Sequence, residues 1–280
     1  MPTALVSVDY EGLPYIVSPR YQLGPEGRLW SEARRIATRL SRAVAEELRE
    51  LGYTRVIIAD SHGLMVNIEP EALPRGTVLV AGFPRLPPSM TPLADEADVA
   101  IFLGYHARAG VLSALAHTYA GRYIVEVRVN GRPASEYLLN ALYLGEKGVP
   151  VGLVAGSEEL MDEVASETPW AVRLPLKKSL GFTAAASPSL EEVEEALRQA
   201  VREMDARLRS GRLKPLEPAK PVRMEITLTS PLYAQIASML PGVEQVDGST
   251  IAYTSATMEE AMRILELLLY AWIGAASLIR

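Results

Sequence analysis

The chain has 280 residues, enough for one large domain or two ordinary ones, and its 49% hydrophobic and 22% charged residues are typical of a globular protein with a sizeable core. Its net charge of −6, with no basic cluster, argues against general nucleic-acid binding. The absence of cysteine excludes disulfides, thiolate metal sites and a cysteine nucleophile, so a transition-metal site has to use His, Asp and Glu.

The two ends of the chain predict a soluble, cytoplasmic protein with no membrane partner. The N-terminus has no basic region and reaches Asp9 and Glu11 almost at once, unlike a signal peptide. The most apolar stretch, 267–279, is too short to span a bilayer, and Arg263 and Glu266 precede it in the same predicted helix.

A strand-helix-strand unit opens the chain. Residues 4–9 form a short apolar run that predicts a buried strand. The helix predicted over 28–51 carries one apolar stripe at helical spacing and ends before Gly52. A second apolar strand follows at 55–59, and this order of elements implies a parallel pair of strands.

The same alternation continues to about residue 187. Strands are predicted over 77–81, 99–103, 123–129, 151–155 and 171–176, and helices over 135–144 and 157–164. We therefore expect an α/β fold in which residues 1–187 form a three-layer α/β/α domain. This domain should contain a mainly parallel sheet and the metal-binding catalytic site.

The rest of the chain, 188–280, predicts a smaller α+β domain. A capping box from Ser189 to Glu192 opens a helix that reaches about residue 208. The linker 211–222 contains prolines three residues apart, which favours an extended connector. A β-α-β-α pattern follows, and it contains none of the candidate ligands described next.

Two acidic residues stand where the first strand ends. Asp9 is its last residue, and Glu11 follows two positions later. In an extended backbone alternate side chains point the same way, so both carboxylates would project toward one place. Their mutual repulsion would be relieved by a bound cation. A solvated turn is the simpler explanation for such a pair taken alone.

The three histidines of the chain are a second signal. His62 and His106 follow apolar runs that predict buried strands, and His117 follows the small-residue segment 109–116. In open α/β sheets, ligand sites form at strand exits. A single histidine is more often a hydrogen-bonded structural residue. Glu136, at the head of a predicted helix, is equally explained as a first-turn glutamate favoured by the helix dipole.

Taken together, five residues have the composition of a two-metal hydrolytic centre. In such a centre a bridging carboxylate holds the ions about 3.5–4 Å apart, and a shared water becomes a hydroxide near neutral pH. The joint pattern is more specific than any one residue, because scattered surface residues need not all fall at element ends. The candidate ligands are Asp9, Glu11, His62, His106 and Glu136.

The order and the residues of these motifs closely resemble those of the D-aminopeptidases of the DppA-like family. The resemblance covers residue 7 to about residue 155 and rests on SVDYEG at 7–12, DSH at 60–62, FLGYHARA at 102–109, AHT at 116–118, and NG at 130–131 followed by Glu136. It implies a dinuclear zinc peptidase with two Zn²⁺ per subunit on the five ligands above. It also implies that His117 is the catalytic histidine and that the protein is a homodecamer of two stacked five-membered rings.

One segment departs from the family pattern. After Gly12 the family usually continues with a small Ile-Ser-Gly-like segment, whereas this chain has Leu13-Pro14-Tyr15. We expect that loop to border the substrate and to affect specificity.

The function expected from the whole pattern is a zinc-dependent aminopeptidase for short peptides with a free N-terminus. A metal-bound hydroxide would attack the peptide carbonyl, with His117 moving a proton or stabilising the oxyanion. The resemblance implies a preference for D-amino acids such as D-Ala. Two alternatives stay open: a two-metal phosphohydrolase, which would need more basic lining than Arg108, and a non-enzymatic dipeptide-binding protein, which would need an export signal.

Overall fold

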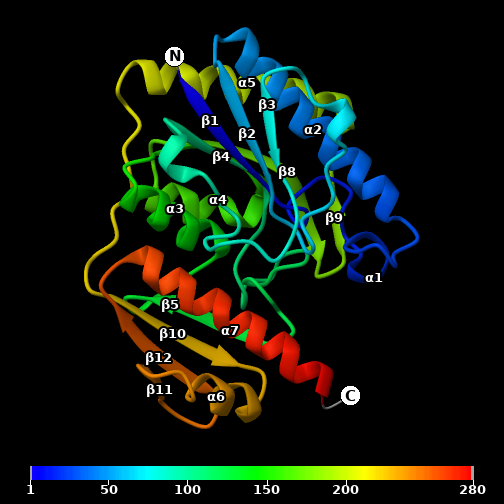
Figure 1. The fold of residues 1–280 in the computed structure, drawn as a ribbon. Helices are drawn as coiled ribbons and strands as arrows, with labels where there is room; N and C mark the ends of the chain where they lie inside the picture. The colour runs from blue at the N-terminus through cyan, green and yellow to red at the C-terminus, as the bar shows by residue number, and fades with distance from the viewer. Residues whose placement is uncertain (1, 279–280) are drawn as a thin grey trace.

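The computed structural model describes residues 2–278, which form two β-sheets with helices around and between them (Figure 1). The larger sheet has the order β3-β2-β1-β4-β7-β8-β9. Its first six strands are parallel, and β9 pairs antiparallel with β8. These strands are β1 (Thr3–Val8), β2 (Arg55–Asp60), β3 (Thr77–Val80), β4 (Val99–Tyr105), β7 (Val151–Ser157), β8 (Val172–Gly181) and β9 (Ala184–Ala186).

Helices cover both faces of the larger sheet. On one face lie α2 (Trp30–Glu50) and α5 (Leu190–Arg209), and on the other lie α3 (Glu136–Glu146) and α4 (Met161–Glu167). The short α1 (Pro19–Gln22) belongs to the connection between β1 and α2. The predicted three-layer α/β/α architecture is therefore confirmed.

The strands are apolar on both sides because both sides are covered. On β4, Val99, Ile101 and Leu103 enter the core beneath α2 and α5, whereas Ala100 and Phe102 enter the core on the opposite side. This alternation follows from the two-residue period of a strand. It leaves the strand ends as the places where polar residues emerge.

The smaller sheet is antiparallel, with the order β11-β12-β10-β5-β6. Helix α7 packs on it and also contacts α3, so that α3 and α7 lie between the two sheets. One hydrophobic core runs continuously from the larger sheet through α3 to this second layer. The elements are β5 (Ile124–Val129), β6 (Arg132–Pro133), β10 (Val222–Leu228), α6 (Pro231–Ala237), β11 (Val243–Gln245), β12 (Thr250–Ser255) and α7 (Met258–Leu278).

The two sheets do not divide the chain at residue 187, where the boundary was expected. Strand β5 comes from the middle of the chain, yet it pairs with β10 in the smaller sheet. Helix α5, expected in the second domain, packs beside α2 on the larger sheet, where Val193, Leu197 and Val201 enter the core. Pairing between distant segments decides both placements, and the local sequence pattern does not report it.

Helix α7 has the length and apolar composition of a membrane-spanning helix. The helix is longer than the apolar stretch 267–279, which taken alone is too short to span a bilayer. Residue 279 lies outside the described range. Its apolar side chains pack against β10, β12, α6 and α3, and Leu265 and Trp272 are fully buried. This packing gives the apolar composition a role inside the fold.

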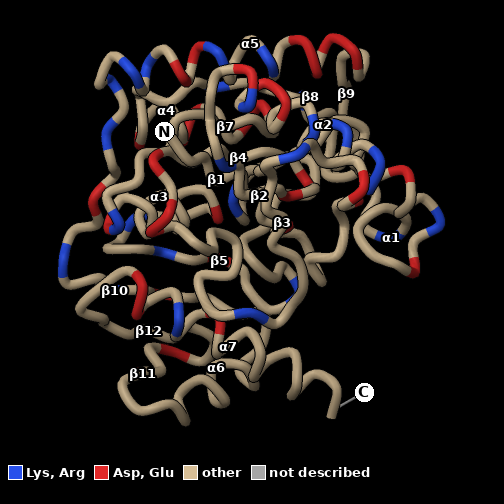
Figure 2. The backbone as a smooth tube through the Cα atoms, turned by 45° about the horizontal axis from the view of Figure 1, so that its top comes forward, with Lys and Arg blue, Asp and Glu red and all other residues tan. Residues whose placement is uncertain are grey.

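Acidic and basic residues alternate along α5 and are interspersed on α2 (Figure 2). Ion pairs join the two helices, with 2.7 Å between Arg198 Nη2 and Glu46 Oε2 and 2.6 Å between Arg202 Nε and Glu47 Oε1. Such pairs contribute little individually at a surface. The α2–α5 layer therefore depends mainly on its apolar contact with the sheet.

Two glycines allow the segments after β1 and along β4 to approach closely. A Cβ on Gly12 would lie 1.8 Å from the carbonyl oxygen of Tyr105, and one on Gly104 would lie 2.0 Å from that of Asp9. Gly104 also has a φ of +79°, which side chains disfavour. The Gly12 N–H donates to the Gly104 carbonyl at 2.7 Å and fixes the turn after β1 against β4.

Replacing Gly12 with alanine should lower the free energy of unfolding by about 3 kcal/mol or more, because the methyl group meets backbone that has no room to move. Gly24→Ala is the matched control, since nothing lies within 4 Å of a Cβ at that position. The control should change stability by less than about 0.5 kcal/mol. Urea unfolding followed by circular dichroism measures both, and equal stabilities would contradict this close approach.

Candidate metal centre

The five predicted ligands come together in one buried cluster, with Asp9 at its centre. Asp9 Oδ1 lies 3.3 Å from Nδ1 of His62, and Asp9 Oδ2 lies 3.3 Å from Nε2 of His106. Glu11 Oε2 is 2.9 Å from Nδ1 of His62. Glu136 Oε1 is 3.5 Å from Nε2 of His106. One carboxylate thus faces two imidazoles, and each imidazole faces a second carboxylate.

The topology of the larger sheet explains this convergence. Strand β1 is hydrogen-bonded between β2 and β4, so Asp9, His62 and His106 follow the ends of three neighbouring parallel strands. Glu136 approaches as the first residue of α3, whose N-cap residue Ser135 accepts a hydrogen bond from the Leu138 N–H.

Each histidine has one ring nitrogen committed to a backbone carbonyl. His62 Nε2 lies 2.9 Å from the Leu23 oxygen, and His106 Nδ1 lies 3.0 Å from the Ala107 oxygen. A carbonyl only accepts, so each of these ring nitrogens carries the proton. The other nitrogen then presents its lone pair on the side where the carboxylates lie, an arrangement typical of metal-binding histidines.

The resulting contacts place acceptors opposite acceptors. Among residues 2–278, Asp9 Oδ2, Glu11 Oε2 and His106 Nε2 are buried without a hydrogen-bond partner. Buried groups of this kind are costly unless a cation or proton lies between them. The donor set therefore fits a divalent metal ion.

The charges of the cluster shift the pKa values of its members. Burial disfavours charge on His62 and His106, but the carboxylates of Glu11 and Glu136 outweigh it and raise the pKa of each imidazole well above its ordinary value. Burial likewise opposes ionisation of Glu11, yet the charge of His62 holds the pKa of that carboxyl well below its usual range. A bound metal ion and these ring protons compete for the same nitrogens.

The donors divide into two sets that share Asp9. Glu11 and His62 lie on one side of it, and His106 and Glu136 lie on the other. Imidazole nitrogen and carboxylate oxygen are the ligands of hydrolytic zinc and manganese centres. Donor atoms of Asp9, Glu11 and His106 lie within 4.8 Å of one another, as do those of His106, His117 and Glu136.

His117 stands at the edge of the cluster. Its ring stacks on that of His106 with 4.3 Å between centroids, and its Nε2 is 3.6 Å from Glu136 Oε1. Its side chain is 24% exposed, whereas the five other side chains are buried. Leu115 and Tyr119, on either side, have φ values of 59° and 58°, a conformation that non-glycine residues adopt only when the surroundings impose it.

A network of hydrogen bonds around Ser7 supports the strand ends next to the cluster. The Ser7 hydroxyl donates to the Met90 carbonyl at 2.7 Å and lies 2.8 Å from the Tyr105 hydroxyl and 2.9 Å from the Ser61 hydroxyl. The Tyr10 ring stacks on the His62 ring at 4.5 Å. These contacts fix the strand ends that carry the ligands.

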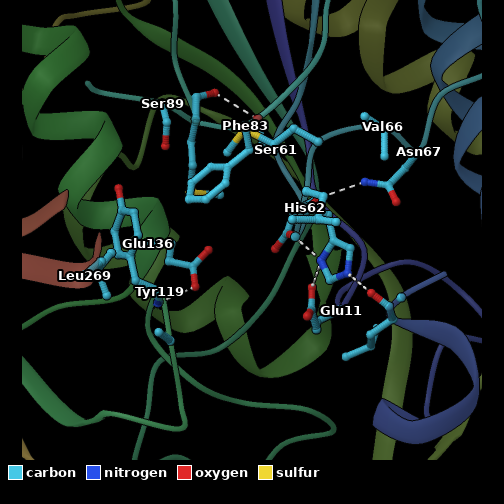
Figure 3. A pocket seen from close by; sticks show the side chains of 18 of the residues that line it. Glu11, Ser61, His62, Val66, Asn67, Phe83, Ser89, Tyr119, Glu136 and Leu269 are labelled. Atoms are coloured by element: carbon cyan, nitrogen blue, oxygen red, sulfur yellow. Dashed lines mark hydrogen bonds and ion pairs between the residues drawn. The ribbon is translucent and has the colours of Figure 1, made fainter. Parts of the chain in front are cut away.

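The cluster opens into a cavity of about 400 Å³ (Figure 3). Asp9, Glu11, His62, His117 and Glu136 contribute to its wall. The rest of the wall is largely apolar and comes from the segments 23–30 and 62–67, the loop 83–90 and helix α7. The volume is that of a small-molecule site.

The segments around the cavity differ in one respect from the expectation drawn from the sequence. The Leu13-Pro14-Tyr15 segment does not line the cavity, because Leu13 is buried in the core and the Tyr15 hydroxyl donates to the Pro188 carbonyl. The C-terminal unit, which contains none of the predicted ligands, also lines the cavity through Glu266 and three further residues of α7. Sequence analysis also missed Tyr119, whose backbone N–H donates to Glu136 Oε1 at 2.6 Å. A backbone donor leaves no signal in residue type.

The fold and the site define an α/β protein in which histidines and carboxylates converge at the strand exits, a donor set that suits a hydrolytic metal centre. The profile of the family described as D-aminopeptidase matches residues 3–267. A D-aminopeptidase from Bacillus subtilis is 28% identical over 264 residues, which are 93% of this chain and 94% of that protein. The structure of the Zn-dependent D-aminopeptidase DppA from Bacillus subtilis, described as a self-compartmentalizing protease, matches with a TM-score of 0.90 at 27% identity, covering 96% of this chain and 97% of that one.

The chain therefore belongs to the D-aminopeptidase family. The predicted resemblance is confirmed, and so is the enzyme class, that of a metallo-aminopeptidase. Family membership favours a peptidase over the phosphohydrolase and the dipeptide-binding protein that the residues alone left open.

Asp9→Asn should abolish stoichiometric zinc binding, because Asp9 faces both histidines and an amide cannot replace its second negative oxygen. Asp95→Asn is the matched control, since the Asp95 side chain is 72% exposed and remote from the cluster. Elemental analysis after zinc reconstitution and dialysis compares both with the unmodified chain. Full zinc retention by Asp9→Asn would contradict the central position given to this residue.

Proposed function

We propose that this protein is a zinc-dependent aminopeptidase that removes the first residue from short peptides and holds two zinc ions per subunit. The strongest support is the position of Asp9 in the cavity wall, where it contacts both histidine–carboxylate pairs. Asp9, Glu11, His62, His106 and Glu136 would hold the metal. When bound, the two ions polarise the scissile carbonyl and lower the pKa of a water molecule, so that the nucleophile forms near neutral pH.

The protein itself orients the groups around the reacting bond. The backbone carbonyls of Leu23 and Ala107 fix the rings of His62 and His106, so that little reorganisation is needed during reaction. The burial of the cluster excludes bulk water and strengthens every electrostatic interaction inside it.

His117 is the group that we assign to proton transfer. The Leu115 carbonyl accepts a hydrogen bond from its Nδ1–H at 2.9 Å, which leaves Nε2 as a base facing the cluster. Because His117 also lines the cavity, it can reach a bound peptide. It would take a proton from the attacking water and return it to the leaving amine, or stabilise the oxyanion as an imidazolium.

The cavity favours short peptides with a free amino group. The carboxylates of Asp9, Glu11 and Glu136 in one wall would attract a protonated N-terminus, and the metal that they would hold could instead take the neutral amine. Either contact would place the first carbonyl beside the nucleophile and supply orientation. The proposal that D-residues such as D-Ala are preferred is supported by the Bacillus subtilis relatives, which are D-aminopeptidases.

The zinc-loaded protein should cleave D-alanyl p-nitroanilide faster than the L-alanyl form, and a chelator should abolish both activities. His117→Ala should lower kcat by about 10²–10⁴-fold, the usual contribution of a general acid–base group, while zinc stays bound. Initial rates on the enantiomeric pair, with zinc analysis of each sample, provide the measurement. Faster L-cleavage would reject the D-preference, and cleavage of N-acetylated peptides alone would reject the aminopeptidase.

We further propose that the chain assembles into a decamer of two stacked five-membered rings. Support comes from the self-compartmentalizing relative and from large apolar side chains on the surface, such as Leu112, Leu180 and Phe182. Light scattering coupled to size exclusion should give a mass of ten chains at working concentration. A monomer mass under the same conditions would overturn this assembly.

A further inference from the structure

A buried carboxyl group in the wall of the cavity has no part in the chemistry proposed above. Glu266, on α7, lines the same cavity as the metal-centre residues, and the residue is only 2% exposed. Its Oε1 accepts a hydrogen bond from the Ser89 backbone N–H at 2.8 Å. Its Oε2 has no hydrogen-bond partner among residues 2–278. A buried carboxylate oxygen in this state is costly unless a proton or the donor group of a ligand meets it.

The basic residue that acts on Glu266 is already committed to other groups. Arg85 donates to the carbonyls of Ser89, Val80 and Asp60 at 2.6, 3.1 and 2.8 Å, using Nε and both terminal nitrogens. It therefore shapes the loop 83–90 instead of neutralising the glutamate. In agreement with this, burial raises the pKa of Glu266 to about 7.

Glu266 belongs to the part of the cavity wall formed by the loop 83–90 and helix α7. Figure 3 shows Ser89, Tyr119 and Leu269 on the same side of the cavity as Glu136, opposite Glu11 and His62. The backbone N–H of Tyr119 donates to Glu136. Burial, together with the neighbouring carboxylates of Glu266 and Glu136, raises the pKa of the Tyr119 hydroxyl. Apolar side chains of the loop 83–90 and of α7 also line the cavity; these are Phe83, Met90, Leu269, Tyr270 and Ile273.

We propose that Glu266 is a specificity residue that binds the terminal ammonium group of a basic side chain on the first residue of the substrate. This inference rests on the proposed peptidase function and extends it beyond alanine-like residues to lysine-like ones. The methylene stem of such a side chain would pack along the apolar wall, and its charged end would meet Oε2 of Glu266. Small-molecule sites are commonly built in this way, from a mostly apolar wall with a few polar groups that fix the orientation of the ligand.

The geometry selects an ammonium group over two other cations. The α-amine of the substrate is joined to the carbon that bears the scissile carbonyl, so it must stay beside the metal centre. A guanidinium binds carboxylates best through two oxygens, but Oε1 of Glu266 is already taken by Ser89. A compact ammonium on a flexible stem needs only the one free oxygen.

The test compares lysyl-alanine with norleucyl-alanine, whose first side chain has nearly the same length without the charge. Both enantiomers of the first residue are used, so that the result does not depend on chirality. For the zinc-loaded protein, kcat/KM should favour the lysyl peptide by about ten-fold or more. Glu266→Gln, which keeps an acceptor for Ser89, should remove most of that ratio. Glu260→Gln, an exposed position on the same helix, is the matched control and should keep it.

Calorimetric titration with free lysine and free norleucine separates this inference from the proposed peptidase function. Lysine should bind the zinc-loaded protein about ten-fold more tightly, and Glu266→Gln should abolish the difference. If lysine binds in this way but no peptide is cleaved, the peptidase function fails and the amine site stands. If peptides are cleaved but lysyl and norleucyl forms are equal in both assays, the role of Glu266 is overturned without recourse to any variant.

Discussion

The structure of the site depends on a single shared carboxylate. Asp9 directs one oxygen at His62 and the other at His106, and each imidazole has its remaining nitrogen tied to the backbone. That arrangement is stable only with positive charge between the groups, because burial removes the water that would otherwise screen them. The order β2-β1-β4 and the side-chain-free turn at Gly12 bring the three residues to one point.

The smaller sheet and the helices packed on it also help to form the site. Strand β5 of this sheet is followed closely by α3, which delivers Glu136 to the cluster, and α7 closes the far wall of the cavity. A continuous core through α3 holds the two layers together. The larger sheet therefore supplies the strand-end ligands, and the smaller layer completes the cavity in which a substrate would lie.

The α/β class and the six clustered histidines and carboxylates could be predicted from the sequence, because strand exits and rare histidines leave local signals. The prediction for Asp9 and Glu11 assumed an extended backbone, whereas β1 ends at Val8 and a turn brings both carboxylates to His62. The sequence pattern placed β5 and α5 with the wrong sheets, because strand partners are chosen by contacts distant in sequence. Glu266 gave no signal, since a glutamate in a helix becomes unusual only once its burial is known.

Anomalous diffraction at the zinc edge, from crystals of the zinc-loaded protein, tests the central claim most directly. The account predicts two zinc peaks per chain, one beside His62 and Glu11 and one beside His106 and Glu136, with Asp9 contacting both. A single peak, or peaks that leave Asp9 without contact to metal, would contradict it.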